Sequence, residues 1–75
     1  MNGLAEALQQ RVGARIRELR ADRGLTQLRL AERCGISRPS VANVEAGRQN
    51  VSLRQLHALA LALGVTVNEL LAGDG

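Results

Sequence analysis

The side chains that could do chemistry in this sequence gather in one short segment, CGISRPSVANVEAG, residues 34–47. Ser37 can cap a helix here, and Pro39 is tolerated in its first turn because no helical N–H is lost there. The apolar residues of this short helix fall on one side and are Ile36, Val41 and Val44. The other side carries Arg38, Pro39, Ser40, Ala42 and Asn43. That face is too small and too polar to belong to a core, and it is less charged than an ordinary solvated surface. The chemistry that it offers is hydrogen bonding by one arginine and one asparagine.

No comparable cluster exists for catalysis. The chain contains one histidine, His57, and one cysteine, Cys34, and they fall on unrelated helices of the expected fold. Nothing around His57 has the arrangement of a metal site or a catalytic triad, and no glycine-rich phosphate loop follows a strand. We therefore expect no enzyme, no catalytic residue, no metal and no cofactor. We predict a surface position for His57 and a packed thiol, rather than a redox sensor, for Cys34.

Length and composition indicate a single domain, residues 1–75, built on an aliphatic core. Of the 75 residues 45% are hydrophobic, and none is Phe, Tyr or Trp. A core of Leu, Val, Ile and Ala suits close-packed helices better than a β-sandwich or barrel. No apolar run reaches the roughly 18 to 20 residues of a membrane span, and residues 1–10 lack the features of a signal peptide. With one cysteine no internal disulfide can form, and we expect a soluble, cytoplasmic protein with no membrane partner.

All ten basic residues are arginines, and they are unevenly spread. Nine lie in residues 11–48 against four acidic residues, whereas residues 49–75 hold one arginine against two acidic residues. Such asymmetry is typical of a protein with one half facing a polyanion. A general bias of the genome towards arginine explains it equally well. Single-stranded nucleic acid is disfavoured as the partner because the chain has no aromatic ring on which a base could stack.

Glycines at positions 24, 35, 47 and 64 each follow an apolar run with helical spacing. A helix C-terminus favours such a residue because glycine adopts left-handed backbone angles readily. The first helix is predicted to run to about Asp22 with apolar positions at Leu8, Val12, Ile16 and Leu19. Its start stays open between Leu4 and Gln10, because Gly13 weakens the early part of the pattern.

Four further helices have identifiable starts. Thr26, Ser37 and Ser52 can cap the second, third and fourth helices. Thr66 and Glu69 have the spacing of a capping box for a fifth. The expected apolar positions are Leu28, Leu30, Ala31 and Cys34 in the second helix, Leu53, Leu56, Leu59, Ala60 and Leu63 on the inward face of the fourth, and Val67, Leu70 and Leu71 in the fifth. No strand alternation appears, so the predicted fold class is all-α, with five helices.

The link between the second and third helices is the most specific feature. Gly35, Ile36 and Ser37 give a turn of three or four residues between two short helices, which is helix-turn-helix spacing over about residues 27–46. Together with the motifs GLTQ, LAERCGIS, VEAG and LALALGVTVNEL in this order, the chain resembles the phage-repressor and Cro type (XRE-type) of helix-turn-helix DNA-binding family. That family includes phage repressors, restriction–modification controller proteins and small antitoxins. The resemblance covers residues 12–71, the expected core, and implies a compact five-helix, lambda-repressor-like domain.

The resemblance also implies which residues contact double-stranded DNA. The base-reading positions of the family fall on Arg38, Pro39 and Asn43. Paired hydrogen bonds join an arginine to guanine and an asparagine to adenine. Pro39 departs from the polar residue often found there and can make only apolar contacts, for instance with a thymine methyl. The implied phosphate-contacting residues are Gln27, Ser37, Arg48, Gln49 and Asn50.

Two further implications of the resemblance concern stability and assembly. Arg20 and Glu45 match a pair that forms a largely buried ion pair in relatives, so Arg20 is expected to hold the fold rather than to read DNA. Specificity in the family comes from homodimers on near-palindromic operators, because so small a domain reads only a few base pairs. The helical spacing places Leu61 opposite the inward face of the fourth helix, and an isolated exposed leucine is ordinary. Together with Val67 and Leu71 of the fifth helix it can instead form a self-complementary apolar patch, and there we expect the dimer interface.

The leading functional hypothesis is therefore a sequence-specific double-stranded DNA-binding transcriptional regulator, a dimeric repressor or an autoregulatory controller protein. The alternative is an antitoxin-type protein that holds a toxin or other protein partner and autoregulates its operon. A third reading is the DNA-binding piece of a larger regulator.

Overall fold

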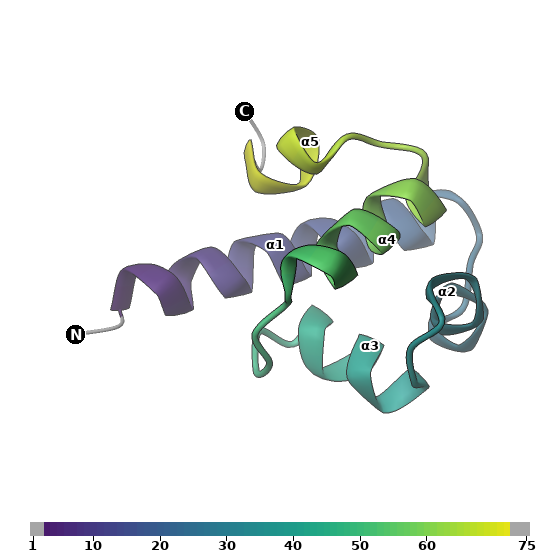
Figure 1. Ribbon diagram of the computed structural model, residues 1–75, viewed down its shortest axis with the longest axis horizontal. Coiled ribbons are helices and arrows are strands. Elements are labelled where there is room, and N and C mark those ends of the chain that lie inside the picture. Colours follow the sequence, from purple (N-terminus) through teal and green to yellow (C-terminus); the bar gives the residue numbers. More distant parts are fainter. Residues whose placement is uncertain (1–2, 73–75) are drawn as a thin grey trace.

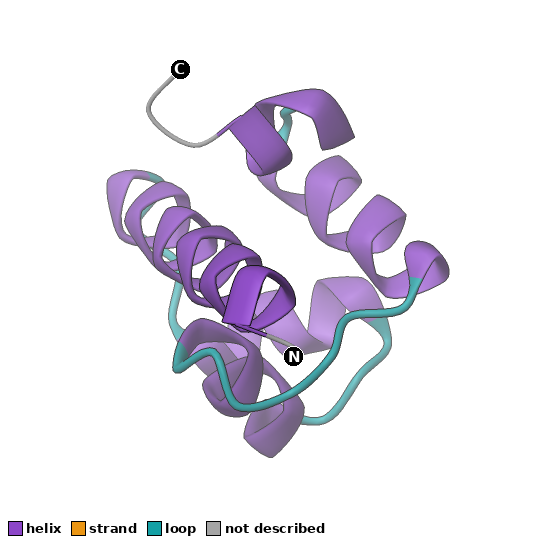
Figure 2. Cartoon of the chain, turned by 90° about the vertical axis from the view of Figure 1, so that its left-hand side faces the viewer, coloured by secondary structure: helices purple, strands orange, loops and turns teal. Residues whose placement is uncertain are grey.

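The computed structural model of the protein describes residues 3–72, and these form five helices joined by short loops. The helices are α1 (Gly3–Asp22), α2 (Gln27–Cys34), α3 (Arg38–Glu45), α4 (Leu53–Leu63) and α5 (Val67–Ala72), as labelled in Figure 1. No strand occurs among the described residues (Figure 2), and the predicted all-α fold is confirmed. No helix in this part of the chain has both the length and the apolar character of a membrane span.

The second to fifth helices begin at the positions that their capping residues predicted. Thr26 and Ser37 each accept a hydrogen bond from the backbone N–H three residues later, at 3.0 and 3.1 Å. α4 and α5 both begin with a reciprocal capping box, formed by Ser52 with Gln55 and by Thr66 with Glu69. Each box satisfies two backbone N–H groups that a helix leaves unpaired at its start. Local side-chain chemistry therefore sets the limits of these elements.

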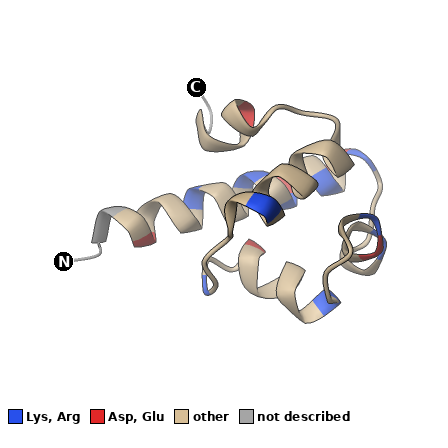
Figure 3. Cartoon of the chain, in the orientation of Figure 1, with Lys and Arg blue, Asp and Glu red and all other residues tan. Residues whose placement is uncertain are grey.

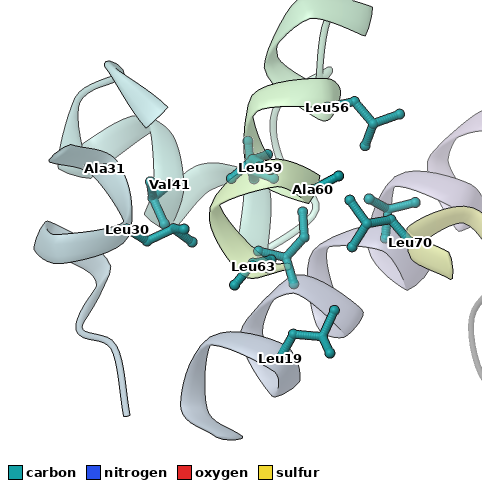
Figure 4. Close-up of a cluster of buried hydrophobic side chains, with 12 residues drawn as sticks. Leu19, Leu30, Ala31, Val41, Leu56, Leu59, Ala60, Leu63 and Leu70 are labelled. Atoms are coloured by element: carbon teal, nitrogen blue, oxygen red, sulfur yellow. The ribbon is translucent and has the colours of Figure 1, made fainter. Parts of the chain in front are cut away.

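One cluster of aliphatic side chains forms the core, and every helix contributes to it (Figure 4). Its members are Val12, Ile16, Leu19, Leu30, Ala31, Val41, Val44, Leu56, Leu59, Ala60, Leu63 and Leu70. The predicted core of Leu, Val, Ile and Ala is confirmed. Because Val41 and Val44 of α3 are both buried in it, the core determines which face of α3 points outward.

Four leucines that were predicted as apolar helix positions are exposed instead, namely Leu8, Leu28, Leu53 and Leu71. Leu53 retains 85% of its accessible surface and Leu28 retains 53%. α4 packs against α1, α2 and α5, but Leu53 is the first residue of α4 and stands about two turns before the buried Ala60, which lies on the same side of the helix at ~3.6 residues per turn. Leu28 lies about 160° from the buried Leu30 by the same geometry. Spacing along one helix did not predict these exposures, because it does not show which part of each helix the neighbouring helices cover.

Cys34 packs against the core from the end of α2. Its Sγ lies 3.7 Å from the carbonyl oxygen of Ala58 in α4. Burial raises the pKa of the thiol above its ordinary value, so less of the reactive thiolate is present at neutral pH. Both features agree with the packed thiol that was predicted.

The start of the first helix, which the sequence left open, lies at Gly3, so Gly13 stands inside α1. Gly13 is buried where α1 crosses the end of α3. A Cβ atom on it would lie 2.2 Å from the carbonyl oxygen of Val44 and 2.9 Å from that of Glu45. Both neighbours are backbone atoms, which cannot move aside without shifting α3. Gly13 therefore serves the close approach of two helices and does not mark a helix end.

We expect opposite exchanges at two adjacent positions of α1 to be destabilising, although helix propensity alone would make Gly13→Ala stabilising. Gly13→Ala should lower the free energy of unfolding by about 1–3 kcal/mol, the usual cost of overpacking a tight contact. Ala14→Gly, at the exposed neighbouring position, should also lower it, by about 1 kcal/mol through helix propensity. Thermal and urea unfolding measure both effects. A Gly13→Ala variant that is more stable than the parent chain would contradict the close contact with α3.

Candidate nucleic-acid interface

The turn between α2 and α3 is built from three residues with separate tasks. Gly35 adopts left-handed backbone angles, with φ of 70°, where residues with a Cβ are strained. The backbone N–H of Ile36 donates to the Ala31 carbonyl oxygen at 3.1 Å, and the Ile36 side chain packs against the core. Ser37 then caps α3. The turn therefore holds α2 and α3 in the predicted helix-turn-helix arrangement.

The outward face of α3 is small and nearly free of charge. Arg38, Pro39 and Ala46 are exposed, and Ala42 and Asn43 are half-buried. Figure 3 shows one basic position at the start of α3 and one acidic position at its end, with none between them. The structure therefore places all three predicted base-reading residues on the first two turns of one helix, on the side away from the buried valines.

An ion pair between Arg20 of α1 and Glu45 of α3 ties these helices together. Arg20 Nε lies 2.6 Å from Glu45 Oε2, and its Nη2 lies 3.0 Å from Oε1. A third donor, Nη1, bonds the Leu25 carbonyl oxygen at 2.8 Å. Only 15% of the Arg20 side chain and 4% of the Glu45 side chain are exposed. The hydrogen bonds to Glu45 raise the pKa of Arg20 further above its ordinary value, so the arginine keeps its charge throughout the neutral range.

Gln27, the first residue of α2, joins the same network. Its Nε2 donates to Glu45 Oε1 at 3.0 Å, a contact that the sequence reasoning missed. The half-buried side chain is thereby held in one orientation beside α3. Its Oε1 and second N–H have no bonding partner among the described residues, and these atoms are available to a phosphate or to another side chain.

The loop after α3 carries the remaining predicted phosphate contacts. The backbone N–H of Arg48 donates to the Asn43 carbonyl oxygen at 2.9 Å, so the loop starts directly beside a predicted base reader. The side-chain N–H of Gln9 in α1 donates to Asn50 Oδ1, so this hydrogen bond does not use the amide N–H₂ of Asn50. Arg48 and Asn50 are exposed and Gln49 is half-buried. Nothing in the sequence around Asn50 predicts this hydrogen bond from α1.

The remaining predicted site residues, Ser37 and the three residues of the dimer interface, differ in how exposed and how engaged their side chains are. The Ser37 hydroxyl is occupied as the cap of α3 and also bonds Ser40 Oγ at 3.0 Å. In the predicted dimer interface, Leu61 is 68% exposed and Leu71 is exposed as well. Val67 is half-buried and packs against the core. Two of those three leucine and valine side chains are therefore open to a partner.

The fold and this surface define an all-helical DNA-binding domain with a helix-turn-helix. The chain matches the Helix-turn-helix family over residues 16–70, and it belongs to that family. It is 45% identical over 63 residues to the immunity repressor protein of Bacillus phage phi105, a match that covers 84% of this chain and 44% of the repressor. The chain thus spans less than half of that repressor's length.

Two of the solved structures that are similar to this chain in both sequence and fold are regulatory proteins. One is the restriction-modification controller protein C.AhdI from Aeromonas hydrophila, with a TM-score of 0.83, 44% identity, and coverage of 85% of this chain and 97% of that one. The other is the biofilm regulator SinR in complex with DNA, with a TM-score of 0.76, 31% identity, and coverage of 80% and 97%. The predicted membership of the repressor-like helix-turn-helix family, which includes transcriptional repressors and controller proteins, is confirmed.

Removing one member of the Arg20–Glu45 pair should be strongly destabilising. Arg20→Ala leaves the Glu45 carboxylate buried without its partner, and we expect a loss of roughly 3–5 kcal/mol in the free energy of unfolding. Arg33→Ala, on an exposed arginine of α2, is the matched control and should have almost no effect. Chemical denaturation of the two variants measures the difference. Equal stability of Arg20→Ala and Arg33→Ala would rule out a structural role for the pair.

Proposed function

We propose that this protein is a sequence-specific regulator of transcription that binds double-stranded DNA as a homodimer, acting as a repressor or as a controller of its own operon. One observation carries the proposal: the face of α3 that bears Arg38, Pro39 and Asn43 is small, outward and almost uncharged. A helix with such a face can approach base edges closely in the major groove. The role needs no catalytic group or cofactor, and a regulator of this kind acts on DNA in the cytoplasm.

Each proposed base reader has a distinct chemistry. Arg38 donates two parallel hydrogen bonds to guanine, and Asn43 pairs with adenine through its amide. Pro39 offers apolar contact only. A good bidentate pair discriminates against the wrong base by about 1–3 kcal/mol.

The proposed phosphate contacts lie on two sides of α3. Gln27 stands at the start of α2 on one side, held there by Glu45. Arg48, Gln49 and Asn50 follow the far end of α3, and Gln9 orients the Asn50 amide so that a donor is free. Ser37 adds its backbone near the start of α3. Contacts of this kind fix the position of the helix on the duplex without reading its sequence.

Selection from a random pool of duplex DNA tests the function and both readers. We expect a near-palindromic consensus whose half-sites have centres about 34–36 Å apart. Arg38→Ala and Asn43→Ala should each relax one position per half-site and weaken binding by about 1–3 kcal/mol. Failure of the unaltered protein to recover any consensus would count against a sequence-specific regulator.

We propose that the homodimer forms through α4 and α5, at Leu61, Val67 and Leu71. Leu61 projects from α4 on the side away from the buried Leu59, about 160° around the helix. With Leu71 exposed on α5, both helices present an apolar side chain to solvent. Burying a leucine contributes about 1.5–3 kcal/mol, and in a two-fold dimer each such contact occurs twice.

Leu61→Glu should therefore raise the dissociation constant of the dimer at least about tenfold, which corresponds to ~1.4 kcal/mol. Leu28→Glu, at the exposed leucine of α2, introduces the same charge outside the proposed interface and should leave the dimer intact. Sedimentation equilibrium over a range of micromolar concentrations provides the comparison. A parent protein and a Leu61→Glu variant that are both monomeric under these conditions would remove the interface.

A further inference from the structure

A polar recess of about 270 Å³ lies between α1, the start of α2 and one flank of α3. Its walls are formed by Arg17, Arg20, Gln27, Ala42, Glu45 and Ala46. Three of these residues, Arg20, Gln27 and Glu45, belong to the hydrogen-bonded network between α1, α2 and α3. Arg17 stands apart from that network and has no assigned role in DNA contact.

The charges of the recess do not cancel. Glu45 neutralises Arg20 through two hydrogen bonds, at 2.6 and 3.0 Å, and Gln27 is neutral. Arg17 is exposed and forms no ion pair or side-chain hydrogen bond with any residue in the described range 3–72. A single uncompensated positive charge therefore remains at this recess, with its guanidinium donors available to an anion.

The recess opens beside the proposed base-reading face. Ala42 and Ala46 form its α3 wall, and both lie within about 60° of Pro39 around that helix. Their side chains are methyl groups, so no bulk separates Arg17 from whatever lies along this flank of α3. A helix in the major groove has a phosphate backbone along each flank, because the groove is bounded by the two strands.

We propose that Arg17 binds a phosphate of the DNA backbone at this recess, on the strand that Gln27 also contacts. The inference rests on the proposed function and extends it, because it adds α1 to the elements that hold the duplex. An arginine suits the task since its planar donors match two phosphate oxygens. Arg20 is less suited to the task, because Glu45 neutralises its charge and three of its five N–H groups are engaged with Glu45 and Leu25.

This contact predicts a salt dependence that separates Arg17 from other exposed arginines. Arg17→Ala should weaken binding to specific and non-specific duplexes alike and reduce the slope of log affinity against log salt by about 1. Arg17→Lys should restore the slope, because it keeps the charge. Arg33→Ala is the matched control, since Arg33 is also exposed on a helix and unpaired among the described residues, but it does not line the recess. Neither Arg17→Ala nor Arg33→Ala should change the unfolding temperature appreciably.

A phosphate-by-phosphate cycle then identifies the contact itself. Each phosphate of the selected half-site is replaced in turn by a neutral methylphosphonate, and affinity is measured for the parent protein, Arg17→Ala and Arg33→Ala. We expect one phosphate whose replacement weakens the parent protein and Arg33→Ala but has no further effect on Arg17→Ala.

Two results would overturn the inference. If the parent protein binds the half-site but every phosphate keeps its full effect in Arg17→Ala, Arg17 makes no such contact while the proposed function stands. If the parent protein itself binds no duplex DNA, the proposed function fails and the contact fails with it. The first result is read from the variant and the second from the parent protein alone, so the two failures are distinguishable.

Discussion

The ion pair of Arg20 with Glu45 locks the orientation of α3, whose outward face is selected by the burial of Val41 and Val44. α3 has only eight residues and two buried valines, so apolar packing alone constrains its rotation weakly. The bonds to Glu45 fix its last turn against α1, and the additional donor from Gln27 fixes it against α2. The contact of Gly13 with the Val44 and Glu45 carbonyls sets the distance between α1 and α3. A rotation of α3 would break all three constraints together.

The same network separates Arg20 from the exposed arginines that surround α3. The charge of Arg20 is neutralised by Glu45 inside the protein, so this arginine does not attract a polyanion such as DNA. Arg17, Arg38 and Arg48 remain exposed around α3, and each of the three stands on a different element. The net charge of +3 therefore says less about DNA binding than the positions of these three residues, because the uncompensated charges are the ones that can displace counterions.

Much of the fold could be predicted from the sequence because its signals are local. Thr26, Ser37 and Ser52 act on the backbone three residues away, and the glycine that follows α2 acts on its own turn. The exposed Leu53, the role of Gly13 and the bond from Gln27 to Glu45 could not be predicted. Each of these three features depends on which helix packs against the residue. The spacing of residues along a single helix does not contain that information. The Arg20–Glu45 pair is long-range too, and only the family resemblance made it predictable.

The small face of α3 sets a limit that links recognition to assembly. Two bidentate readers give about 2–6 kcal/mol of discrimination for one copy, while specific sites are typically preferred over non-specific DNA by about 4–10 kcal/mol. One copy thus falls at the low end of what a regulator needs, and phosphate contacts add affinity without adding preference. Two copies on a two-fold site double the readout and reach the required range. The surface that joins the copies is therefore as much a part of sequence recognition as Arg38 and Asn43, although it lies on other helices and contacts no base.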